Sequence, residues 1–321
     1  MTQVIRLKCG ESLWNETAAF AENCSWIAGK HFADMLRGNR FSDWEAAFAA
    51  VEDGKVVGYC TFLKEDYYPE NRYWPWISSI FVDESARGRR VSHRMIDAAI
   101  GYARSRGFSK VYIPSDMEGF YEKCGFAPID ALVNYGGDTD KVFMKEIGRL
   151  ELHVPALDEL WYRQRMMSDP ATMSYNAGYA LDFDGYHADT GCIDFPEERW
   201  AGWYGRFIGR EPEKFYAYIV RKEDGAFIGE VVLRQEGAPG RYEMGVVIEA
   251  CHRGRGYSAE AMRLLMDAAF NRLNAQVVCN DFERSRDAAL KLHMNAGFEI
   301  VREDDCVHLE LTRERYLKRF G

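Results

Sequence analysis

The feature of this sequence that most constrains its fold is an internal duplication. An Asp-Gly hairpin signal, an arginine-glycine loop and a Gly-Phe pair occur in the same order in both halves of the chain. The copies are 171, 166 and 172 residues apart, from Asp53 to Asp224, from Arg87 to Arg253 and from Gly125 to Gly297. These separations are far longer than the period of a solenoid repeat. The sequence therefore predicts one domain written twice.

The length and composition support two full domains. A chain of 321 residues is long enough for two domains of ordinary size, and the repeat places the boundary near residues 147–152. We expect domains at 1–148 and 149–321. Hydrophobic residues make up 47% of the chain, which is enough for two cores and excludes a disordered protein.

Each copy shows the same alternation of strand and helix signals. Apolar, β-branched stretches flank each Asp-Gly dipeptide, which is a strong hairpin turn signal. A further strand leads into each arginine-glycine loop, and an amphipathic helix follows the loop, predicted at 88–105 in the first copy. Short strand and helix signals come after it. This order predicts a mixed α/β fold in two tandem domains, each with a mostly antiparallel sheet flanked by helices.

The charge balance restricts the partners. The net charge is −9 and the pI is about 5.4, whereas a nucleic-acid-binding protein needs a basic face. An acidic surface is compatible with cationic substrates such as amines. The chain has no apolar stretch of 18 residues and no leader-like start. We therefore expect a cytoplasmic protein that binds neither nucleic acid nor membranes.

The eight cysteines are scattered singly and form no CxxC pair. This pattern indicates neither a zinc site nor a thioredoxin-like redox centre. Reduced thiols in a cytoplasmic protein are the simplest interpretation, and no metal site is expected.

Both arginine-glycine loops precede a helix. The first amides of a helix have no partner within it and lie at the positive end of its dipole, and glycine lets the main chain approach a ligand closely. Flanking arginines add charge-assisted bonds to an anion. We therefore predict two phosphate-binding loops, Arg87, Gly88, Arg89, Arg90, Val91 and Ser92 in the first copy and Arg253, Gly254, Arg255, Gly256, Tyr257 and Ser258 in the second.

Two classes of nucleotide are candidate ligands of these loops. The Walker pattern GxxxxGK[ST] is absent, which argues against a nucleoside triphosphate. Residues 254–259 fit GxGxxG/A, and Asp281 follows at a suitable distance for a dinucleotide site. However, the strands before this loop form a tight hairpin instead of opening a βαβ unit, and Arg89 and Arg90 break the pattern in the first copy. A nicotinamide enzyme is therefore disfavoured.

Both halves resemble the GNAT superfamily of acetyl-coenzyme A-dependent N-acetyltransferases. The signature Arg/Gln-x-x-Gly-x-Gly/Ala fits 253–258, with Ser258 in the last place, and fits 87–92 less well because Arg90 replaces a glycine. The resemblance implies acetyl-CoA as co-substrate, with its pyrophosphate on the loop amides. It also implies pairing of the pantetheine arm with the preceding strands, at Ile80, Phe81 and Val82 and at Val246, Val247 and Ile248. The second copy is most similar to the ribosomal-protein acetyltransferase-like branch.

The same resemblance suggests where the chemistry lies. The family's x-Tyr-x-Lys-x-Gly-Phe signature fits 120–126, which makes Tyr121 a candidate to protonate the leaving thiolate; His293 stands at the matching place in the second copy. Glu243 is the candidate base in the second copy, with Glu230 as another. Glu65 and Asp66 border the corresponding region of the first copy. Because no Cys-His pair suggests an acetyl-enzyme, direct transfer is the simpler mechanism.

Two functions from different classes remain open at this point. One is an N-acetyltransferase acting on a small-molecule primary amine. The other is an acyl-CoA-binding or structural pseudo-enzyme in which one or both copies are inactive. The sequence fits a monomer with an internal pseudo-dimer or a homodimer, and it identifies neither the acceptor nor the active copy.

Overall fold

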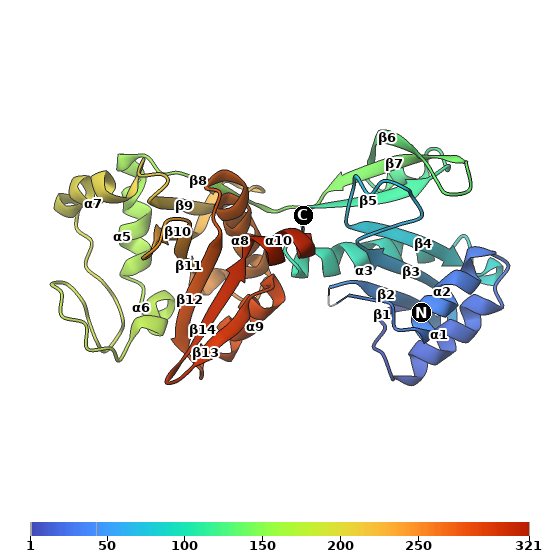
Figure 1. The fold of residues 1–321 in the computed structure, drawn as a ribbon, viewed down its shortest axis with the longest axis horizontal. Coiled ribbons are helices and arrows are strands. Elements are labelled where there is room, and N and C mark those ends of the chain that lie inside the picture. The colour runs from blue at the N-terminus through green and yellow to red at the C-terminus, as the bar shows by residue number, and fades with distance from the viewer. Residues whose placement is uncertain (1, 43, 321) are drawn as a thin grey trace. The chain divides into compact units, whose positions relative to one another are not determined.

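The computed structural model describes residues 2–42 and 44–320, and the chain divides into two compact units, 1–148 and 149–321. Figure 1 shows a central sheet with helices in each unit, from blue to green in the first and from lime to red in the second. In the described ranges no helix is both long and apolar enough to span a bilayer.

The N-terminal unit contains a seven-stranded sheet. Its strands are β1 (Gln3–Arg6), β2 (Ala46–Glu52), β3 (Lys55–Leu63), β4 (Trp76–Val82), β5 (Lys110–Ser115), β6 (Ala127–Val133) and β7 (Thr139–Glu146). Its α-helices are α1 (Ser12–Glu22), α2 (Ala28–Arg37), α3 (Val91–Ser105) and α4 (Phe120–Lys123). The strand order is β1-β2-β3-β4-β5-β7-β6, and β4 and β5 run parallel while the other neighbours are antiparallel.

The C-terminal unit repeats this topology strand for strand. Its strands are β8 (Leu150–His153), β9 (Lys214–Arg221), β10 (Ala226–Gln235), β11 (Arg241–Ile248), β12 (Val277–Glu283), β13 (Glu299–Glu303) and β14 (Cys306–Thr312), in the order β8-β9-β10-β11-β12-β14-β13. Its α-helices are α5 (Trp161–Met167), α6 (Pro170–Met173), α7 (Trp200–Phe207), α8 (Tyr257–Asp267), α9 (Asp287–Ala296) and α10 (Arg313–Phe320). Here β11 and β12 form the parallel pair. The prediction of two mixed α/β domains is confirmed.

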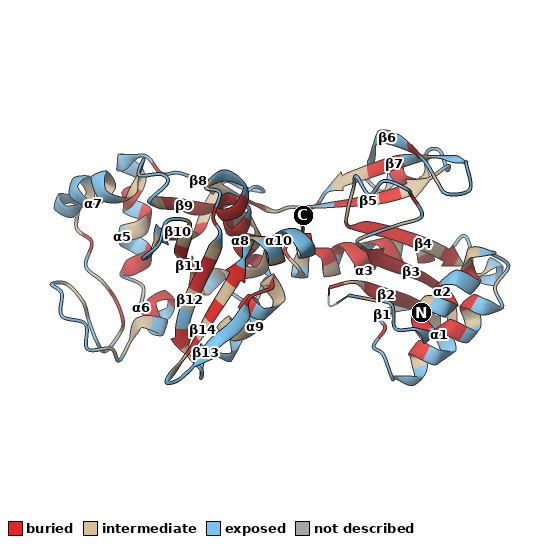
Figure 2. Ribbon diagram, in the orientation of Figure 1, coloured by how far each residue is buried: buried red, intermediate tan, exposed pale blue. Residues whose placement is uncertain are grey.

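Helices cover both faces of the N-terminal sheet. On one face, Phe32 of α2 stacks on Tyr59 of β3 with ring centroids 4.5 Å apart, and Tyr59 stacks on Phe81 of β4. On the other face, α3 contacts β2, β3 and β4 through the side that carries Met95 and Ala99. Figure 2 shows the resulting buried band along β2, β3 and β4. The core thus fixes the position of β4 from both sides.

The C-terminal sheet is covered in the same way by different helices. Tyr162 of α5 and Trp203 of α7 pack on Tyr216 and Tyr218 of β9, in one aromatic cluster. The opposite face receives α8, which contacts β8, β10 and β11. This arrangement places β11 between an aromatic layer and the helix that follows the second loop.

Two strands have no counterpart in the sequence-based prediction. Nearly every residue of β6 is exposed or half-buried, and every residue of β13 is exposed, so neither shows the alternation of apolar and polar residues that marks a strand. Both form because their main chains pair with β7 and β14, respectively. Long-range pairing, which a local pattern does not encode, decides these two strands.

Candidate functional site

The two arginine-glycine loops have the same backbone path. Each follows a short 3₁₀ turn, Glu84–Ala86 or Ala250–His252, and each passes through two residues with positive φ. In the second loop these are Gly254 and Gly256, both with φ of 75°. In the first loop they are Gly88, with φ of 76°, and Arg90, with φ of 59°. The duplication predicted from the sequence therefore extends to loop conformation, although Arg90 is not a glycine.

Both loops present main-chain amides that lack acceptors. Arg90 and Gly256 are the N-cap residues of α3 and α8, and neither helix start has a side-chain cap. In the described chain, no backbone or side-chain acceptor meets the amides of 88–93 or 254–259. A Cβ added at Gly88 or Gly254 would meet no atom within 4 Å, so the space above each loop is open. Such a helix start favours an anion.

The arginines of the two loops bind different acceptors within the protein. The Nε atoms of Arg87 and Arg253 donate to the last carbonyls of their own strands, Val82 O and Ile248 O, at 3.1 and 3.0 Å. The Arg89 guanidinium lies 2.8 Å from the Glu52 carboxylate. These three arginines shape the loops. From the sequence alone, they are predicted only to contact the ligand.

In each unit the strand before the loop has an open edge. Strand β4 pairs with β5 only at Trp76, opposite Tyr112, so residues 77–82 have no β5 partner. Strand β11 pairs with β12 from Arg241 to Glu243, and residues 244–248 continue without one. Since a parallel partner is missing there, the main-chain groups on that edge are available to an extended ligand. The predicted pantetheine positions all lie on these open edges.

The two open edges are not identical. In β4 the pairing with β3 shifts register between Tyr59 and Thr61, and Ser79 adopts a φ of 49°. In β11 the pairing with β10 runs without a shift from Tyr242 to Ile248. A bulge redirects side chains and bends a strand. The first unit therefore has a bent strand where the edge opens, and the second has a straight one.

A cavity of about 360 Å³ lies at the open edge of the C-terminal unit. Its walls come from both faces of the sheet. Val232 and Val247 belong to the face that carries the aromatic cluster, whereas Met262 comes from α8 on the opposite face. The polar side chains on the lining include Arg163, Glu230, Asn280, Arg286 and His293.

Arg163 and Glu230 form a buried ion pair on this wall. Each side chain is only 12% exposed, and the Arg163 guanidinium and the Tyr216 hydroxyl both donate to Glu230 Oε2. Arg163 also lies over the Trp203 ring, 4.6 Å from its centroid. Burial alone would lower the pKa of Arg163, but the adjacent Glu230 carboxylate raises it above its usual range. Glu230 is thus engaged by two donors, and Arg163, which sequence reasoning missed, holds it there.

His293 lies on the cavity wall with both ring nitrogens engaged. It is 4% exposed, Nδ1 lies 2.8 Å from Ala289 O, and Nε2 lies 3.0 Å from the side-chain nitrogen of Asn280. This network assigns the proton to Nδ1, which donates to the carbonyl, while Nε2 accepts from Asn280. Burial lowers the pKa of His293 to about 4. The imidazole is therefore neutral near pH 7, and this geometry does not favour a role as proton donor.

Glu243 lies away from that cavity. Its side chain is 42% exposed and its carboxylate is 3.5 Å from Arg234, the residue opposite it on β10. It is not among the residues that line the cavity. Glu243 is the last residue of β11 that pairs with β12, and it does not line the cavity that Glu230 and His293 line.

Tyr121 is buried at the start of α4. It is 6% exposed and packs on Phe143 of β7, with ring centroids 5.4 Å apart. Burial raises the pKa of its phenol, partly offset by the hydroxyl of Ser115 at the end of β5. Strand β5 continues to Ser115 beyond Tyr112, its last pairing with β4, so Tyr121 contacts the part of β5 that lies past the point where the sheet opens. Its phenol remains protonated at neutral pH.

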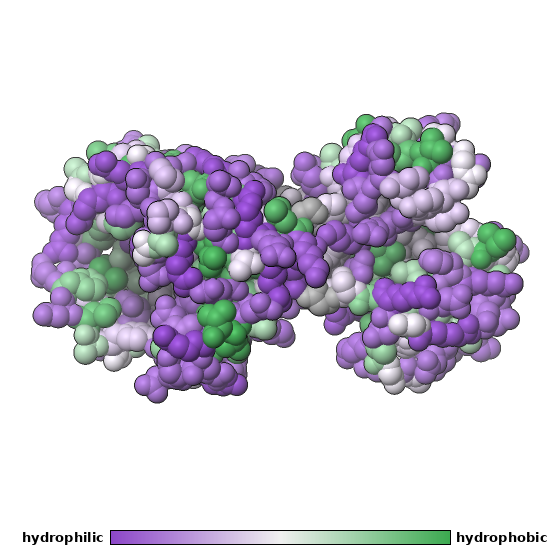
Figure 3. All heavy atoms as spheres, viewed as in Figure 1, coloured by the Kyte–Doolittle hydropathy of each residue, from purple (hydrophilic) through white to green (hydrophobic). Residues whose placement is uncertain are grey.

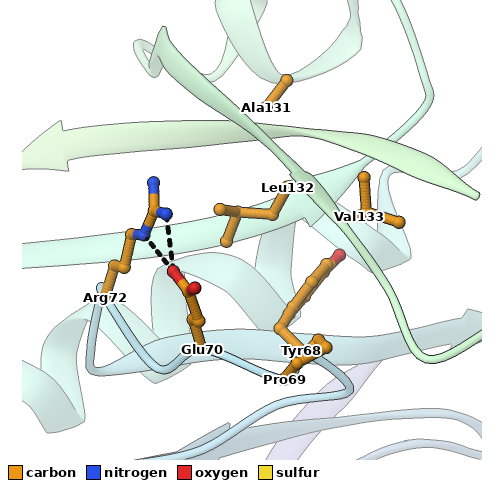
Figure 4. A pocket seen from close by; sticks show the side chains of 7 residues that line it. All are labelled: Tyr68, Pro69, Glu70, Arg72, Ala131, Leu132 and Val133. Atoms are coloured by element: carbon orange, nitrogen blue, oxygen red, sulfur yellow. Dashed lines mark hydrogen bonds and ion pairs between the residues drawn. The ribbon is translucent and has the colours of Figure 1, made fainter.

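Two other features are distinct from the loops: one lies in the N-terminal unit, and the other directly precedes the second loop. Figure 4 shows a cavity of about 310 Å³ between β6 and residues 68–72, where Glu70 and Arg72 form an exposed ion pair. In the C-terminal unit, Glu249, Cys251 and His252 bring ligand-type atoms within 4.8 Å of one another, but Arg165 already binds the Glu249 carboxylate at 2.8 Å. The face seen in Figure 3 is mostly hydrophilic with separate apolar groups.

Comparisons with known proteins agree with this architecture. Residues 11–126 match the acetyltransferase (GNAT) family model, and residues 149–299 match the acetyltransferase (GNAT) domain model. A stretch of 52 residues is 40% identical to glucosamine 6-phosphate N-acetyltransferase 1 of Oryza sativa subsp. japonica. This stretch is 16% of the chain and 32% of that protein, so the match spans about a third of the relative's length.

Solved structures with a similar fold include two acetyltransferases. A GNAT-family acetyltransferase from Bacillus anthracis is 13% identical, with a TM-score of 0.42, and the match covers 52% of this chain and 96% of that one. Spermidine N-acetyltransferase from Vibrio cholerae, solved with CoA and spermine, is 16% identical, with a TM-score of 0.43 over 53% and 98% of the two chains. The similarity of the second copy to the ribosomal-protein acetyltransferase-like branch stays a prediction. The two family models together cover most of the sequence, and the chain therefore belongs to the GNAT acetyltransferase family, with one such domain in each half.

Proposed function

We propose that this protein is an acetyl-CoA-dependent N-acetyltransferase that transfers the acetyl group directly to the primary amine of a small molecule. In each unit, a loop with unpartnered amides lies next to a strand with an open edge. This arrangement, present twice, is the observation that carries the proposal. Eight free cysteines without a disulfide fit the cytoplasmic location that we also propose.

The chain's own groups fit the coenzyme in both units. The amides of 88–93 and 254–259 would receive the pyrophosphate, and the open edges at Ile80–Val82 and Val246–Ile248 would pair with the pantetheine arm. The positive φ at Gly254 and Gly256 turns the main chain without a side chain over the loop. When bound, acetyl-CoA supplies a thioester-activated acetyl group.

The residues of the N-terminal unit are the better arranged for chemistry. The departing thiolate needs a proton, and because a thiol has a pKa of about 8.5, a weak acid suffices. Tyr121 is protonated, buried and beside the opening of the sheet. We propose that Tyr121 supplies this proton.

An alternative applies to the C-terminal unit: it binds acyl-CoA without catalysing transfer. The observation in its favour is that both polar candidates on its cavity wall are engaged. Arg163 and Tyr216 hold Glu230, while Ala289 and Asn280 hold His293. Turnover by a chain whose N-terminal loop is blocked would exclude this alternative.

Calorimetric titration of acetyl-CoA into the full chain tests the binding part of the proposal. We expect Gly256→Trp to remove the C-terminal site, because the indole would cover the loop amides. The matched control is Gly237→Trp, since Gly237 has a similar φ of 65° in the exposed turn between β10 and β11. Loss of one site in Gly256→Trp but not in Gly237→Trp supports the proposal. No acetyl-CoA binding by the unmodified chain would refute it.

Thiol release in the presence of an amine panel tests the chemistry. The panel contains spermidine and glucosamine 6-phosphate, on which the named relatives act, together with amino acids and aminoglycosides. We expect Tyr121→Phe to lower kcat by about tenfold to a hundredfold while acetyl-CoA affinity stays unchanged. An unchanged kcat would remove Tyr121 from the mechanism.

A further inference from the structure

Asp66 is a half-buried residue in the connection between β3 and β4. Its Oδ1 accepts the Tyr67 amide at 2.7 Å. Its Oδ2 is closed to solvent and has no hydrogen-bond partner in the described part of the chain. The backbone therefore fixes the position of Oδ1, whereas Oδ2 is the oxygen without a hydrogen-bond partner.

No ion pair neutralises the Asp66 carboxylate in the described part of the chain, and Asp140 adds negative charge near it. Asp140 of β7 lies close enough to disfavour a second charge, and its own Oδ2 accepts from the Tyr68 hydroxyl at 2.7 Å. The other groups that face Asp66 are the Ser78 hydroxyl on β4 and His31 on α2, and both favour the charged carboxylate, but burial outweighs them. Within residues 2–42 and 44–320, no Lys, Arg or His lies within ion-pair distance of the Asp66 carboxylate.

This carboxylate lies at the point where β4 bends and its edge opens. Ser78 pairs with Thr61, its hydroxyl is 3.0 Å from the Thr61 hydroxyl, and the next residue is Ser79 of the bulge. Trp76, the last residue of β4 paired with β5, stacks on Tyr68 of the same connection. Asp66 is thus close to the irregularity of β4, where the open edge begins.

Asp66 and Tyr121 lie on opposite faces of the sheet. Val142 of β7 shares a cluster with Tyr68 and Trp76, on the face of Asp66, and Asp140 is two residues before it. Tyr121 packs on Phe143, the next residue of the strand, which points to the other face because side chains alternate. The opening in the sheet therefore has a carboxylate on one side and a phenol on the other.

An unpaired buried carboxylate is costly, so its environment favours either a proton or an incoming cation. Burial accordingly raises the pKa of Asp66, with Asp140 adding to the effect. A carboxylate whose pKa is raised toward neutrality is a stronger base than a solvated one. An amine acceptor arrives near pH 7 as an ammonium ion and must lose a proton before it can attack.

We propose that Asp66 binds the ammonium group of the acceptor and takes its proton, with Asp140 adding to the negative potential; this inference rests on the proposed acetyltransferase function. In this step one N–H bond of the ammonium breaks, an O–H bond forms at Asp66 Oδ2, and the nitrogen lone pair becomes available to the thioester carbonyl. Tyr121 on the opposite face gives its proton to the departing sulfur. The amide nitrogen loses its second proton to solvent, and the Tyr121 phenolate is reprotonated from solvent. Asp66 then returns its proton to solvent.

The second unit has no equivalent of Asp66. Residues 64–75 connect β3 to β4, whereas the matching connection from β10 to β11 is only 236–240. In its place, the second unit has the neutralised Arg163–Glu230 pair on the corresponding face. The proposal therefore assigns recognition of a cationic amine to the N-terminal unit.

Calorimetric titration of 1,4-diaminobutane into the full chain, with and without saturating CoA, tests the binding step. Asp66→Asn keeps an acceptor for the Tyr67 amide but removes the charge, and Glu70→Gln is the matched control because Glu70 is an exposed carboxylate of the same connection. We expect Asp66→Asn to weaken diamine binding at least tenfold and Glu70→Gln to change it less than twofold. Equal binding by Asp66→Asn, or no binding by the unmodified chain, overturns the proposal. Acetyl-CoA affinity, measured separately, reports on the proposed function alone.

The pH dependence of turnover separates a base from a structural residue. In Asp66→Asn only the free amine reacts, so we expect kcat/KM to fall about a hundredfold at pH 7 and to approach the unmodified value as the pH nears the pKa of the amine. We also expect the denaturation midpoint of Asp66→Asn to be higher at pH 8 and unchanged below pH 3.8, where Asp66 is protonated in both states. A merely structural role would lower the midpoint and give a rate loss that does not depend on pH. Those results would overturn the proposal.

Discussion

Arg90 occupies the same left-handed backbone position at the start of α3 as Gly256 does at the start of α8. Their φ and ψ angles are 59° and 28° for Arg90 and 75° and 16° for Gly256. A residue with a Cβ is strained in this conformation, whereas glycine is not. The first loop therefore retains the shape of the second at the expense of local strain.

Replacing Arg90 separates strain from charge. We expect Arg90→Gly to raise the free energy of unfolding of the N-terminal unit by about 1 kcal/mol, because the strain at φ of 59° is relieved. Arg90→Ala removes the same charge but keeps the Cβ, so it should bring no such gain. Urea denaturation of the three full-length chains measures the difference. A less stable Arg90→Gly than Arg90→Ala would contradict the assignment of strain.

Glu260 ties the start of the second unit to its loop helix. Its Oε1 accepts the amides of Arg149 and Leu150 at 2.5 and 2.8 Å, and the side chain is 1% exposed. Glu260→Ala leaves two buried amides unsatisfied, so we expect a loss of about 3 kcal/mol in the free energy of unfolding of this unit. Glu260→Gln, which keeps an acceptor, should lose less. Glu151→Ala, at an exposed position of β8, is the control, and a loss as large as that of Glu260→Ala would show that the effect is not specific.

His293 should make the C-terminal unit lose stability in mild acid. Its pKa is about 4 when folded and about 6.5 when unfolded, so the unfolded chain binds more protons between these values. Stability is therefore fully present above pH 6.5 and falls by up to about 3 kcal/mol as the pH drops to 4. His293→Gln cannot titrate and should flatten this dependence.

The control for His293 is His187→Gln, at an exposed histidine that lies 3.0 Å from Asp194, and its effect on stability should be much smaller because an exposed pair contributes little. Denaturation at several pH values measures each curve. NMR titration of the His293 ring provides an independent check, and a pKa near 6.5 in the folded protein would contradict the buried, neutral imidazole.

Gly229 permits the close approach of two strands beside the open edge. A Cβ at this position would lie 2.1 Å from the Val247 carbonyl oxygen, which belongs to the opposing strand. We expect Gly229→Ala to lower the free energy of unfolding by more than about 2 kcal/mol, because main chain must shift to admit the methyl group. Gly202→Ala in α7, where a Cβ meets nothing within 4 Å, should be neutral or stabilising. Equal stability of the two variants would rule out the close contact.

The sequence by itself determined the features that repeat locally. The Asp-Gly turns, the loops before α3 and α8, the mixed fold and its duplication follow from short patterns, since turn geometry and helix starts depend on neighbouring residues. The edge strands β6 and β13 escaped prediction because their exposed residues carry no alternation. Their formation depends on pairing with β7 and β14.

Only the tertiary structure decided the chemical state of the polar candidates. Strand periodicity gives the face of a residue, but its charge depends on which distant segments cover it. Arg163 of α5 neutralises Glu230, and Ala289 and Asn280 fix a neutral His293. Glu243 is partly exposed and pairs with Arg234. Asp66, next to the exposed Glu65 in the sequence, has one carboxylate oxygen closed to solvent and no ion pair in the described part of the chain. Burial and long-range partners set these properties, because desolvation and nearby charges are what shift ionisation.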